Sequence, residues 1–262
     1  MTETPTPDID ELPPEAVAAA APERTDDESP LFAVGIGPGN LDYLTPRGKR
    51  AIREADAVVG FETVVAFVEE HIEGEQFACG YDDEDETLAA FAEAVADGAV
   101  GTAVLMGDPN FSGYQFLGRV EAAVDRPVRL VPGISSLQIA ASRARTPMED
   151  STFVTLHKRG DLATDRGRLR ADVGEHHLLV LPRPYDVMPG DIAADLLDAG
   201  ASASLTALVY ERLTHDDEAV TRTTLGELAT EAGGSGPEET QFSDLSVLVV
   251  RAESPNQPTE SP

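Results

Sequence analysis

The 262-residue sequence contains no tryptophan and a single cysteine, Cys79. A lone cysteine excludes a disulfide within the chain and makes a cysteine-based metal site unfavourable, so we expect no metal. No apolar run approaches the roughly 20 residues that a membrane-spanning helix needs, and we expect no membrane partner. The N-terminus also lacks the charged start and the apolar stretch of a signal peptide. The sequence therefore predicts a cytoplasmic protein.

Basic residues are also few: 19 of them stand against 48 acidic residues, which gives a formal net charge of −29. Only Lys49 and Lys158 are lysines. Such a surface repels the phosphates of nucleic acids and anionic lipids, which disfavours both as partners. The acidic groups also repel one another, and at about 1 M salt a Debye length of roughly 3 Å removes most of that repulsion. We therefore predict a halophilic protein, with an ordinary acidic protein carrying disordered tails as the alternative.

The two ends of the chain lack a sustained apolar pattern. Residues 1–29 are rich in proline, threonine and acidic residues, and residues 253–262 form a similar polar tail. Such segments cannot bury enough apolar surface to fold, so we predict a disordered arm and a disordered tail. Within the arm, Ala16–Ala21 can form a brief helix.

Between the ends, short apolar runs alternate with helical patterns. This alternation predicts an α/β fold whose first half is a mostly parallel sheet covered by helices. Pro147 marks a boundary that we place near 146–150, and we expect α/β domains over residues 30–147 and 148–252. The predicted strands are 31–36, 57–59, 101–106, 128–131, 152–156, 177–181, 203–209 and 246–250, and the predicted helices are 45–55, 63–70, 86–96, 113–124, 135–145, 192–199 and 225–231.

A glycine-bearing loop, Gly35–Asn40 with the sequence GIGPGN, follows the first predicted strand. Its glycines permit a tight turn and a close approach of the backbone to a ligand. The dinucleotide-binding fingerprint, however, needs glycine where Asn40 stands, and Pro38 removes a backbone donor that a phosphate would use. A plain strand-to-loop turn is the alternative to ligand binding here.

Two further loops of this kind are Gly107–Gly113, with the sequence GDPNFSG, and Val131–Leu137, with the sequence VPGISSL. Ligands of open α/β sheets bind at the carboxyl ends of strands, where Asp108 would suit a cationic ligand or a pair of ribose hydroxyls. Ser135 and Ser136 would open a helix, where N–H groups and hydroxyls bind polar ligand atoms. Simple capping of the following helix is the alternative role for all three side chains.

Taken in order, the three loops resemble those of the tetrapyrrole methylase family, the S-adenosylmethionine-dependent methyltransferases of cobalamin and sirohaem synthesis. The matching stretches are VGIGPGNLDYLT, ADAVVG, MGDPNFSG and VPGISS, and the resemblance covers roughly residues 31–251. It implies two α/β domains with a cofactor cleft between them, S-adenosyl-L-methionine as cofactor, a tetrapyrrole substrate and a homodimer.

Two later stretches resemble segments of the family members that methylate C5 of cobalt-precorrin-7. One is Thr155–Gly160, TLHKRG, and the other is VYERLT followed by DDE over residues 209–218. Three residues differ from the pattern of these relatives. They affect the prediction of which ring carbon is methylated, but not the resemblance to the family. Asn40 stands where many relatives have aspartate, Lys158 is inserted into its segment, and Arg212 replaces the usual asparagine.

The resemblance also implies which residues bind the cofactor. They are Pro38, Asp108, Phe111, Ser135, Ser136 and Leu156, with His157 as a further candidate. Methyl transfer from a sulfonium is an in-line displacement whose leaving thioether needs no protonation, so positioning supplies most of the acceleration. The sequence singles out no general base, and His157 is the one catalytic candidate, because it alone among the histidines lies in a motif.

Basic residues gather in the second half, where five of them lie within 13 positions, at 158, 159, 166, 168 and 170. A substrate that carries acetate and propionate groups needs a local positive field on so acidic a protein. We hypothesise that Lys158, Arg159 and Arg168 pair with substrate carboxylates, since arginine can bind them bidentately. A salt-bridged surface loop is the alternative.

Other functions stay open at this point. A methylase of the same fold can act at another ring carbon or on a diphthamide precursor, as diphthine synthase does. A non-catalytic S-adenosylmethionine-binding protein would share the loops. Asn40 and Pro38 argue against a nicotinamide oxidoreductase.

Overall fold

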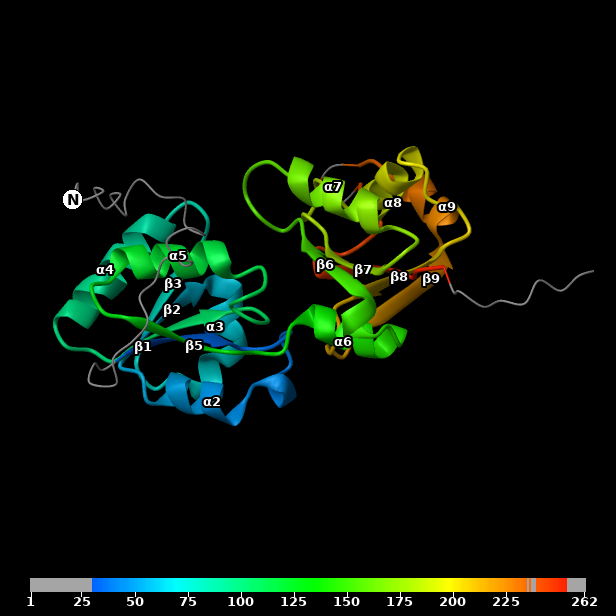
Figure 1. Cartoon of the computed structure of the whole chain (residues 1–262). Helices are drawn as coiled ribbons and strands as arrows, with labels where there is room; N and C mark the ends of the chain where they lie inside the picture. The colour runs from blue at the N-terminus through cyan, green and yellow to red at the C-terminus, as the bar shows by residue number, and fades with distance from the viewer. Residues whose placement is uncertain (1–29, 235, 237–238, 254–262) are drawn as a thin grey trace, which may run out of the picture. The chain divides into compact units, whose positions relative to one another are not determined.

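A computed structural model describes residues 30–234, 236 and 239–253 of the chain. The predicted arm with its short helix, and the tail beyond residue 253, lie outside the described residues. The chain divides into two compact units, unit 1 ending at Ser135 and unit 2 beginning at Ser136 (Figure 1). This division precedes the boundary that we placed near 146–150, because helix α6 (Ser136–Ala144) packs against the sheet of unit 2.

Unit 1 is built on a parallel sheet of five strands in the order β3-β2-β4-β1-β5. Every pairing within it is parallel, which confirms the predicted α/β fold. The carboxyl ends of parallel strands share one edge, which is called the carboxyl edge below. The strands are β1 (Leu31–Gly35), β2 (Ala57–Phe61), β3 (Glu75–Cys79), β4 (Gly101–Leu105) and β5 (Val128–Val131).

Helices cover both faces of this sheet. On one face, α4 and α5 contribute Phe91 and Leu117 to a core that also contains Ala33. On the other face, α2 and α3 contribute Ile52 and Val65 to a second core. Successive strand residues point to opposite faces, so each buried strand supplies both cores. The helices are α2 (Pro46–Arg53), α3 (Glu62–Val68), α4 (Glu84–Ala96) and α5 (Tyr114–Ala123), with short 3-10 turns at Leu41–Tyr43 and Glu69–His71.

Unit 2 contains a mixed sheet of five strands in the order β6-β7-β10-β8-β9. β6 and β7 are parallel, and the other pairs are antiparallel. Three helices, α7, α8 and α9, cover one face and bury Leu169, Leu196 and Leu225, while α6 lies on the other face (Figure 1). The elements are β6 (Ser151–Thr155), α7 (Ala163–Asp172), β7 (His177–Leu181), α8 (Pro189–Asp198), β8 (Thr206–Glu211), β9 (Ala219–Thr224), α9 (Leu225–Leu228) and β10 (Ser246–Val250), with short 3-10 turns at Met148–Asp150 and Ala229–Glu231.

Two strands and one α-helix were not predicted from the sequence. β3 and β9 are edge strands, and most of their side chains are exposed or only half-buried. An apolar run indicates a strand that is buried on both faces. An edge strand does not need such a run, so β3 and β9 gave no signal in the sequence. α7 occupies the basic segment whose alternative interpretation was a surface loop, and Leu169 is its one buried residue within the described helix.

Candidate functional site

The loops that carry the three motifs lie together at the carboxyl edge of unit 1. Gly35–Asn40 begins at the last residue of β1, Gly107–Gly113 follows β4, and the loop from Pro132 to Ser135 follows β5. The strands β4, β1 and β5 are neighbours in the sheet. Since all three run in the same direction, motifs separated along the chain are brought side by side, as expected for a ligand site in an open α/β sheet.

One glycine of each loop packs directly against the backbone of the other two. A Cβ atom built on Gly35 would lie 2.5 Å from the carbonyl oxygen of Gly107 and 2.6 Å from the nitrogen of Gly133. A Cβ atom on Gly133 would lie 2.6 Å from the carbonyl oxygen of Gly35 and closer still to that of Gly107. No side chain fits between these backbones at Gly35 or Gly133, so the three loop starts are fixed against one another by the absence of Cβ atoms at these two positions.

The first and second loops are also joined by a pair of backbone hydrogen bonds. Gly37 N donates to the carbonyl oxygen of Gly107 at 3.2 Å, and Gly107 N donates to that of Gly37 at 2.7 Å. Both residues have positive φ angles, 87° at Gly37 and 68° at Gly107. Glycine adopts this region without strain, so the sequence GIG at the end of β1 has a structural reason at its second glycine.

Asp108 links the second loop to the third. Its Oδ1 accepts a hydrogen bond from Asn110 N at 2.7 Å, and its Oδ2 accepts one from Gly133 N at 3.1 Å. The alternative role, capping of the next helix, is wrong, because α5 begins after Gly113 and no side chain caps its first turn. Each carboxylate oxygen keeps a lone pair for a further donor.

The other predicted cofactor residues of this region occupy the same loops. Pro38 is buried and Phe111 is half-buried, and Phe111 N donates to the carbonyl oxygen of Asp108 at 2.9 Å. Ser135 is buried and ends unit 1, while Ser136 is the first residue of α6 in unit 2. The structure thus brings Pro38, Asp108, Phe111 and Ser135 to one edge of unit 1.

In unit 2, the predicted residues lie just beyond β6. The side chain of Leu156 is fully buried in the core of the unit, and its N–H donates to the carbonyl oxygen of Leu181 at 2.8 Å. His157 is exposed, and its N–H donates to Thr155 Oγ1 at 3.2 Å. Desolvation by the surrounding protein lowers the pKa of His157, and the Asp244 carboxylate opposes that effect. A lowered pKa favours the neutral form of the imidazole.

The basic residues proposed for the substrate are not equivalent in the structure. Lys158 Nζ lies 2.7 Å from Asp165 Oδ2, so it already has a carboxylate partner. Arg159 and Arg168 are exposed, the latter on α7. The neighbouring Arg166 and Arg170 both pair with Asp195, as a salt-bridged surface would.

Arg183 is a residue of this region that the sequence did not reveal. Its Nη2 donates to the carbonyl oxygen of Gly160 at 2.7 Å, and its Nε donates to that of Leu156 at 3.4 Å. It therefore holds the loop that carries His157, Lys158 and Arg159. The sequence offered no signal for it, because it lies outside every motif, in the turn after β7.

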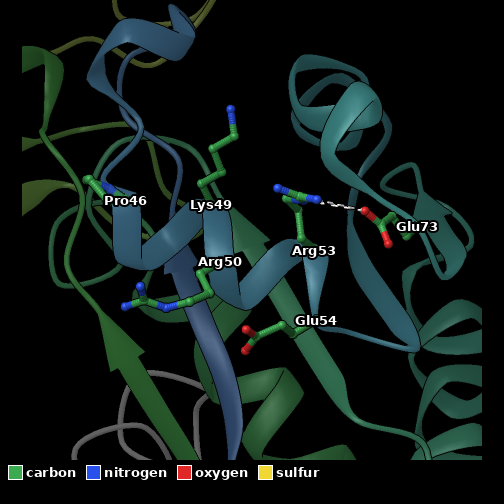
Figure 2. A pocket seen from close by; sticks show the side chains of 6 residues that line it. All are labelled: Pro46, Lys49, Arg50, Arg53, Glu54 and Glu73. Carbon is green, nitrogen blue, oxygen red and sulfur yellow. Dashed lines mark hydrogen bonds and ion pairs between the residues drawn. The ribbon is translucent and has the colours of Figure 1, made fainter.

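A groove with a volume of about 480 Å³ lies elsewhere on unit 1, along α2 (Figure 2). Its lining is mostly charged, and Arg53 pairs with Glu73 across it at 3.3 Å. None of the predicted cofactor or substrate residues lines it. The described His, Cys, Asp and Glu side chains form no group of three or more that would hold a metal ion. None of the helices in the described part of the chain is long and apolar enough to cross a membrane.

Glu121 on α5 is an unusual carboxylate of unit 1. Its Oε2 is buried without a hydrogen-bond partner among the described residues, and desolvation raises its pKa from 4.5 to about 7. The folded state thus binds this proton more tightly than the unfolded chain does. The resulting stabilisation is complete below pH 4.5 and is lost as the pH rises towards 7.

Replacing Glu121 with glutamine should therefore stabilise the protein at alkaline pH, by about 1–2 kcal/mol after allowance for partial solvent screening. Below pH 4 the gain should vanish, because the native carboxyl is then neutral as well. Urea unfolding at pH 4 and pH 8.5 measures the difference. The matched control is Glu93→Gln, at an exposed position on α4. Equal effects of Glu121→Gln at both pH values would contradict the prediction.

Comparison with known proteins matches the chain to a family over most of its length. The model of the family described as Tetrapyrrole (Corrin/Porphyrin) Methylases matches residues 30–229. The probable cobalt-precorrin-7 C(5)-methyltransferase of Methanocaldococcus jannaschii is 27% identical over 213 residues, which cover 76% of this chain and 91% of that protein.

Solved structures show the same fold at lower identity. A cobalt precorrin-4 methyltransferase is 17% identical with a TM-score of 0.65, over 92% of this chain and 98% of that one. The uroporphyrin-III C-methyl transferase from Thermus thermophilus, complexed with S-adenyl homocysteine, is 23% identical with a TM-score of 0.63, over 85% of this chain and 92% of that one. These likenesses confirm the predicted fold class.

Proposed function

Because the chain belongs to the tetrapyrrole methylase family, we propose that it transfers a methyl group from S-adenosylmethionine to C5 of cobalt-precorrin-7 in cobalamin biosynthesis. Membership of the family makes the chain an S-adenosylmethionine-dependent methyltransferase. The proposed specificity for C5 of cobalt-precorrin-7 rests on the similarity to the M. jannaschii protein, which extends over nearly the whole of that protein. Family membership removes the oxidoreductase alternative.

In unit 1, the interlocked loops supply what an in-line displacement requires. The cofactor provides a methyl group on a sulfonium, and the protein's task is to hold it in line with the acceptor carbon. Asp108 has acceptor capacity left for a pair of hydroxyls, while Pro38, Phe111 and Ser135 lie in the loops fixed beside it. All six predicted cofactor contacts, including Ser136 and Leu156, stay predictions, and His157 stays a catalytic candidate.

The substrate carboxylates are proposed to pair with the basic residues that follow β6 and lie on α7. Charge reversal by Arg159→Glu or Arg168→Glu should raise the KM for the substrate about threefold to tenfold at low salt, because each contact is solvent-exposed. The Kd for S-adenosylhomocysteine should not change. Steady-state kinetics and calorimetry measure the two quantities.

The matched control is Arg50→Glu, a reversal of equal charge at an exposed position on α2. Lys158 is a poorer choice, since its loss would also leave Asp165 without its partner. An unchanged KM in both variants, or an equal rise in the Arg50→Glu control, would remove the proposed carboxylate contacts.

The decisive experiment for the ring position is incubation with S-adenosylmethionine and a set of cobalt-precorrins. Mass spectrometry should show one added methyl group on cobalt-precorrin-7, and NMR should place it at C5. A methyl group at another ring carbon, or turnover of a diphthamide precursor alone, would move the chain to another activity of the same fold. The fold itself does not choose among these, since the structural likeness extends to a cobalt precorrin-4 methyltransferase.

The surroundings in which the enzyme works are part of the proposal. A net charge of −29 supports a salt-rich cytoplasm, and family resemblance supports a homodimer. Sedimentation velocity at low and at molar salt tests both. A monomer at every salt concentration would remove the dimer, and unfolding at molar salt would remove the halophilic assignment.

A further inference from the structure

An exposed aromatic ring stands at the carboxyl edge of unit 1. Tyr81 follows β3 after one intervening residue, and 68% of its surface is exposed. Among the described residues it is the most exposed large hydrophobic side chain, and the others of this kind are aliphatic. A single exposed apolar side chain is common on protein surfaces. Tyr81 differs because other aromatic rings hold its ring in place.

The ring of Tyr81 is supported by a column of aromatic side chains. Its centroid lies 5.0 Å from that of Phe61, the last residue of β2, at an interplanar angle of 45°. Phe61 lies 5.0 Å from Phe116 of α5, which is buried in the core. Aromatic pairs at such separations are mutually attractive. Tyr81 is therefore the outer member of a stack that is anchored inside unit 1.

The position of the stack relative to the cofactor loops follows from the sheet order. Neighbouring strands lie about 4.8 Å apart, so β3 is separated from β4 by about 10 Å and from β1 by about 14 Å. The loops after β4 and β1 are those that contain Asp108 and Pro38. A macrocycle of four linked five-membered rings spans a comparable distance, and the faces of its rings are largely apolar.

The charges around Tyr81 restrict what can lie on it. The next four residues of the chain, from Asp82 to Asp85, are all acidic. Three of these carboxylates have partners: Asp83 accepts from Gly80 N at 2.7 Å, and Glu84 and Asp85 lie 3.1 and 3.0 Å from Arg119. Asp82, Asp83 and Asp85 are exposed and form an acidic rim, while Glu84 is buried. This rim repels the carboxylate arms of a tetrapyrrole but not the uncharged face of its rings.

From this placement we infer that Tyr81, backed by Phe61 and Phe116, is the surface on which one face of the tetrapyrrole rests during methyl transfer. This inference rests on the proposed function and adds a positioning residue to it. The stack fixes the height and tilt of the ring system above the edge, and the acidic rim turns the carboxylate arms away from this side. Tyr81 takes no part in bond making.

The test compares Tyr81→Ala with Tyr81→Phe by two independent readouts. With cobalt-precorrin-7, Tyr81→Ala should raise KM about fivefold to tenfold, while Tyr81→Phe should stay within about twofold of the wild type. The Kd for S-adenosylhomocysteine should be unchanged in both. With uroporphyrin III, a flat tetrapyrrole that needs no turnover, absorbance titration should show the same order of affinities.

The two readouts separate this inference from the proposed function. If the wild type leaves cobalt-precorrin-7 unmethylated but binds uroporphyrin III through Tyr81, the proposed C5 activity fails, and the role of Tyr81 as a tetrapyrrole-binding surface stands. If Tyr81→Ala keeps the wild-type KM and the wild-type affinity for uroporphyrin III, the proposed role of Tyr81 is overturned. The same role is overturned if the wild type does not bind uroporphyrin III, or if Tyr81→Ala changes only the association state. Val220→Ala, at another exposed apolar position, on β9, is the matched control.

Discussion

Replacing Gly133 with alanine is expected to abolish S-adenosylhomocysteine binding and to destabilise the protein by at least about 3 kcal/mol. The new methyl group would overlap the carbonyl oxygens of Gly35 and Gly107, which belong to the two neighbouring loops. These atoms are backbone atoms at the end of β1 and in the loop after β4, so they cannot move aside as a flexible side chain would. Either the third loop moves outward or the three strand ends separate, and both changes disrupt the surface formed by the loops.

Urea unfolding gives the stability change, and calorimetry gives the affinity. The matched control is Gly167→Ala on α7, where a Cβ atom would meet nothing within 4 Å. There the substitution should stabilise the helix by about 0.5–1 kcal/mol, because alanine favours the helical backbone over glycine. If Gly133→Ala binds S-adenosylhomocysteine as the wild type does, the loops are not interlocked in the way described here.

The central strands and the motif loops could be predicted from the sequence for a common physical reason. A strand buried on both faces must be almost wholly apolar, as GTAVL in β4 and SVLVV in β10 are. The loops after β1 and β4 contain glycines whose spacing is dictated by close backbone approach. Such requirements act on individual residues and therefore remain visible in a single sequence.

What escaped prediction depends on contacts between distant residues. The edge strands β3 and β9 obtain their structure from the neighbour they pair with, and their side chains carry no apolar pattern. Arg183 holds the loop after β6 through the carbonyl oxygens of Gly160 and Leu156, which any residue type supplies. Likewise, helix α6 was assigned to the first half because the sequence does not tell which sheet it packs against. Tertiary pairing, rather than local pattern, decides all of these.

Single residues of the site also show the difference between what a local sequence pattern reveals and what tertiary contacts decide. Asp108 was identified as a ligand candidate from its place after a strand, with helix capping as the alternative. The structure shows a third role that neither interpretation contained, because its carboxylate joins the second and third loops through Asn110 N and Gly133 N. The sequence separates Asp108 from Gly133 by 25 positions, so no local pattern could have connected them.

Asp108→Ala is accordingly expected to weaken S-adenosylhomocysteine binding by at least about 100-fold. Two backbone N–H groups would lose their acceptor, at a cost of about 1–3 kcal/mol in stability, and any ribose contact would be lost as well. Asp108→Asn keeps one oxygen of the same shape, so it should restore part of the stability. Calorimetry with S-adenosylhomocysteine and urea unfolding measure the two effects separately, with Asp125→Asn at an exposed loop position as the control.

The asparagine variant distinguishes the two ways in which Asp108 can act. If the carboxylate only positions the loops, stability and affinity should recover together, because both follow the bond to Gly133 N. If it also accepts hydrogen bonds from the cofactor, Asp108→Asn should recover stability but remain weak in binding, since the amide nitrogen cannot accept. We expect the second outcome, because each carboxylate oxygen has a lone pair left after the bonds described above. Wild-type affinity in Asp108→Ala would exclude both roles and would place the cofactor away from the second loop.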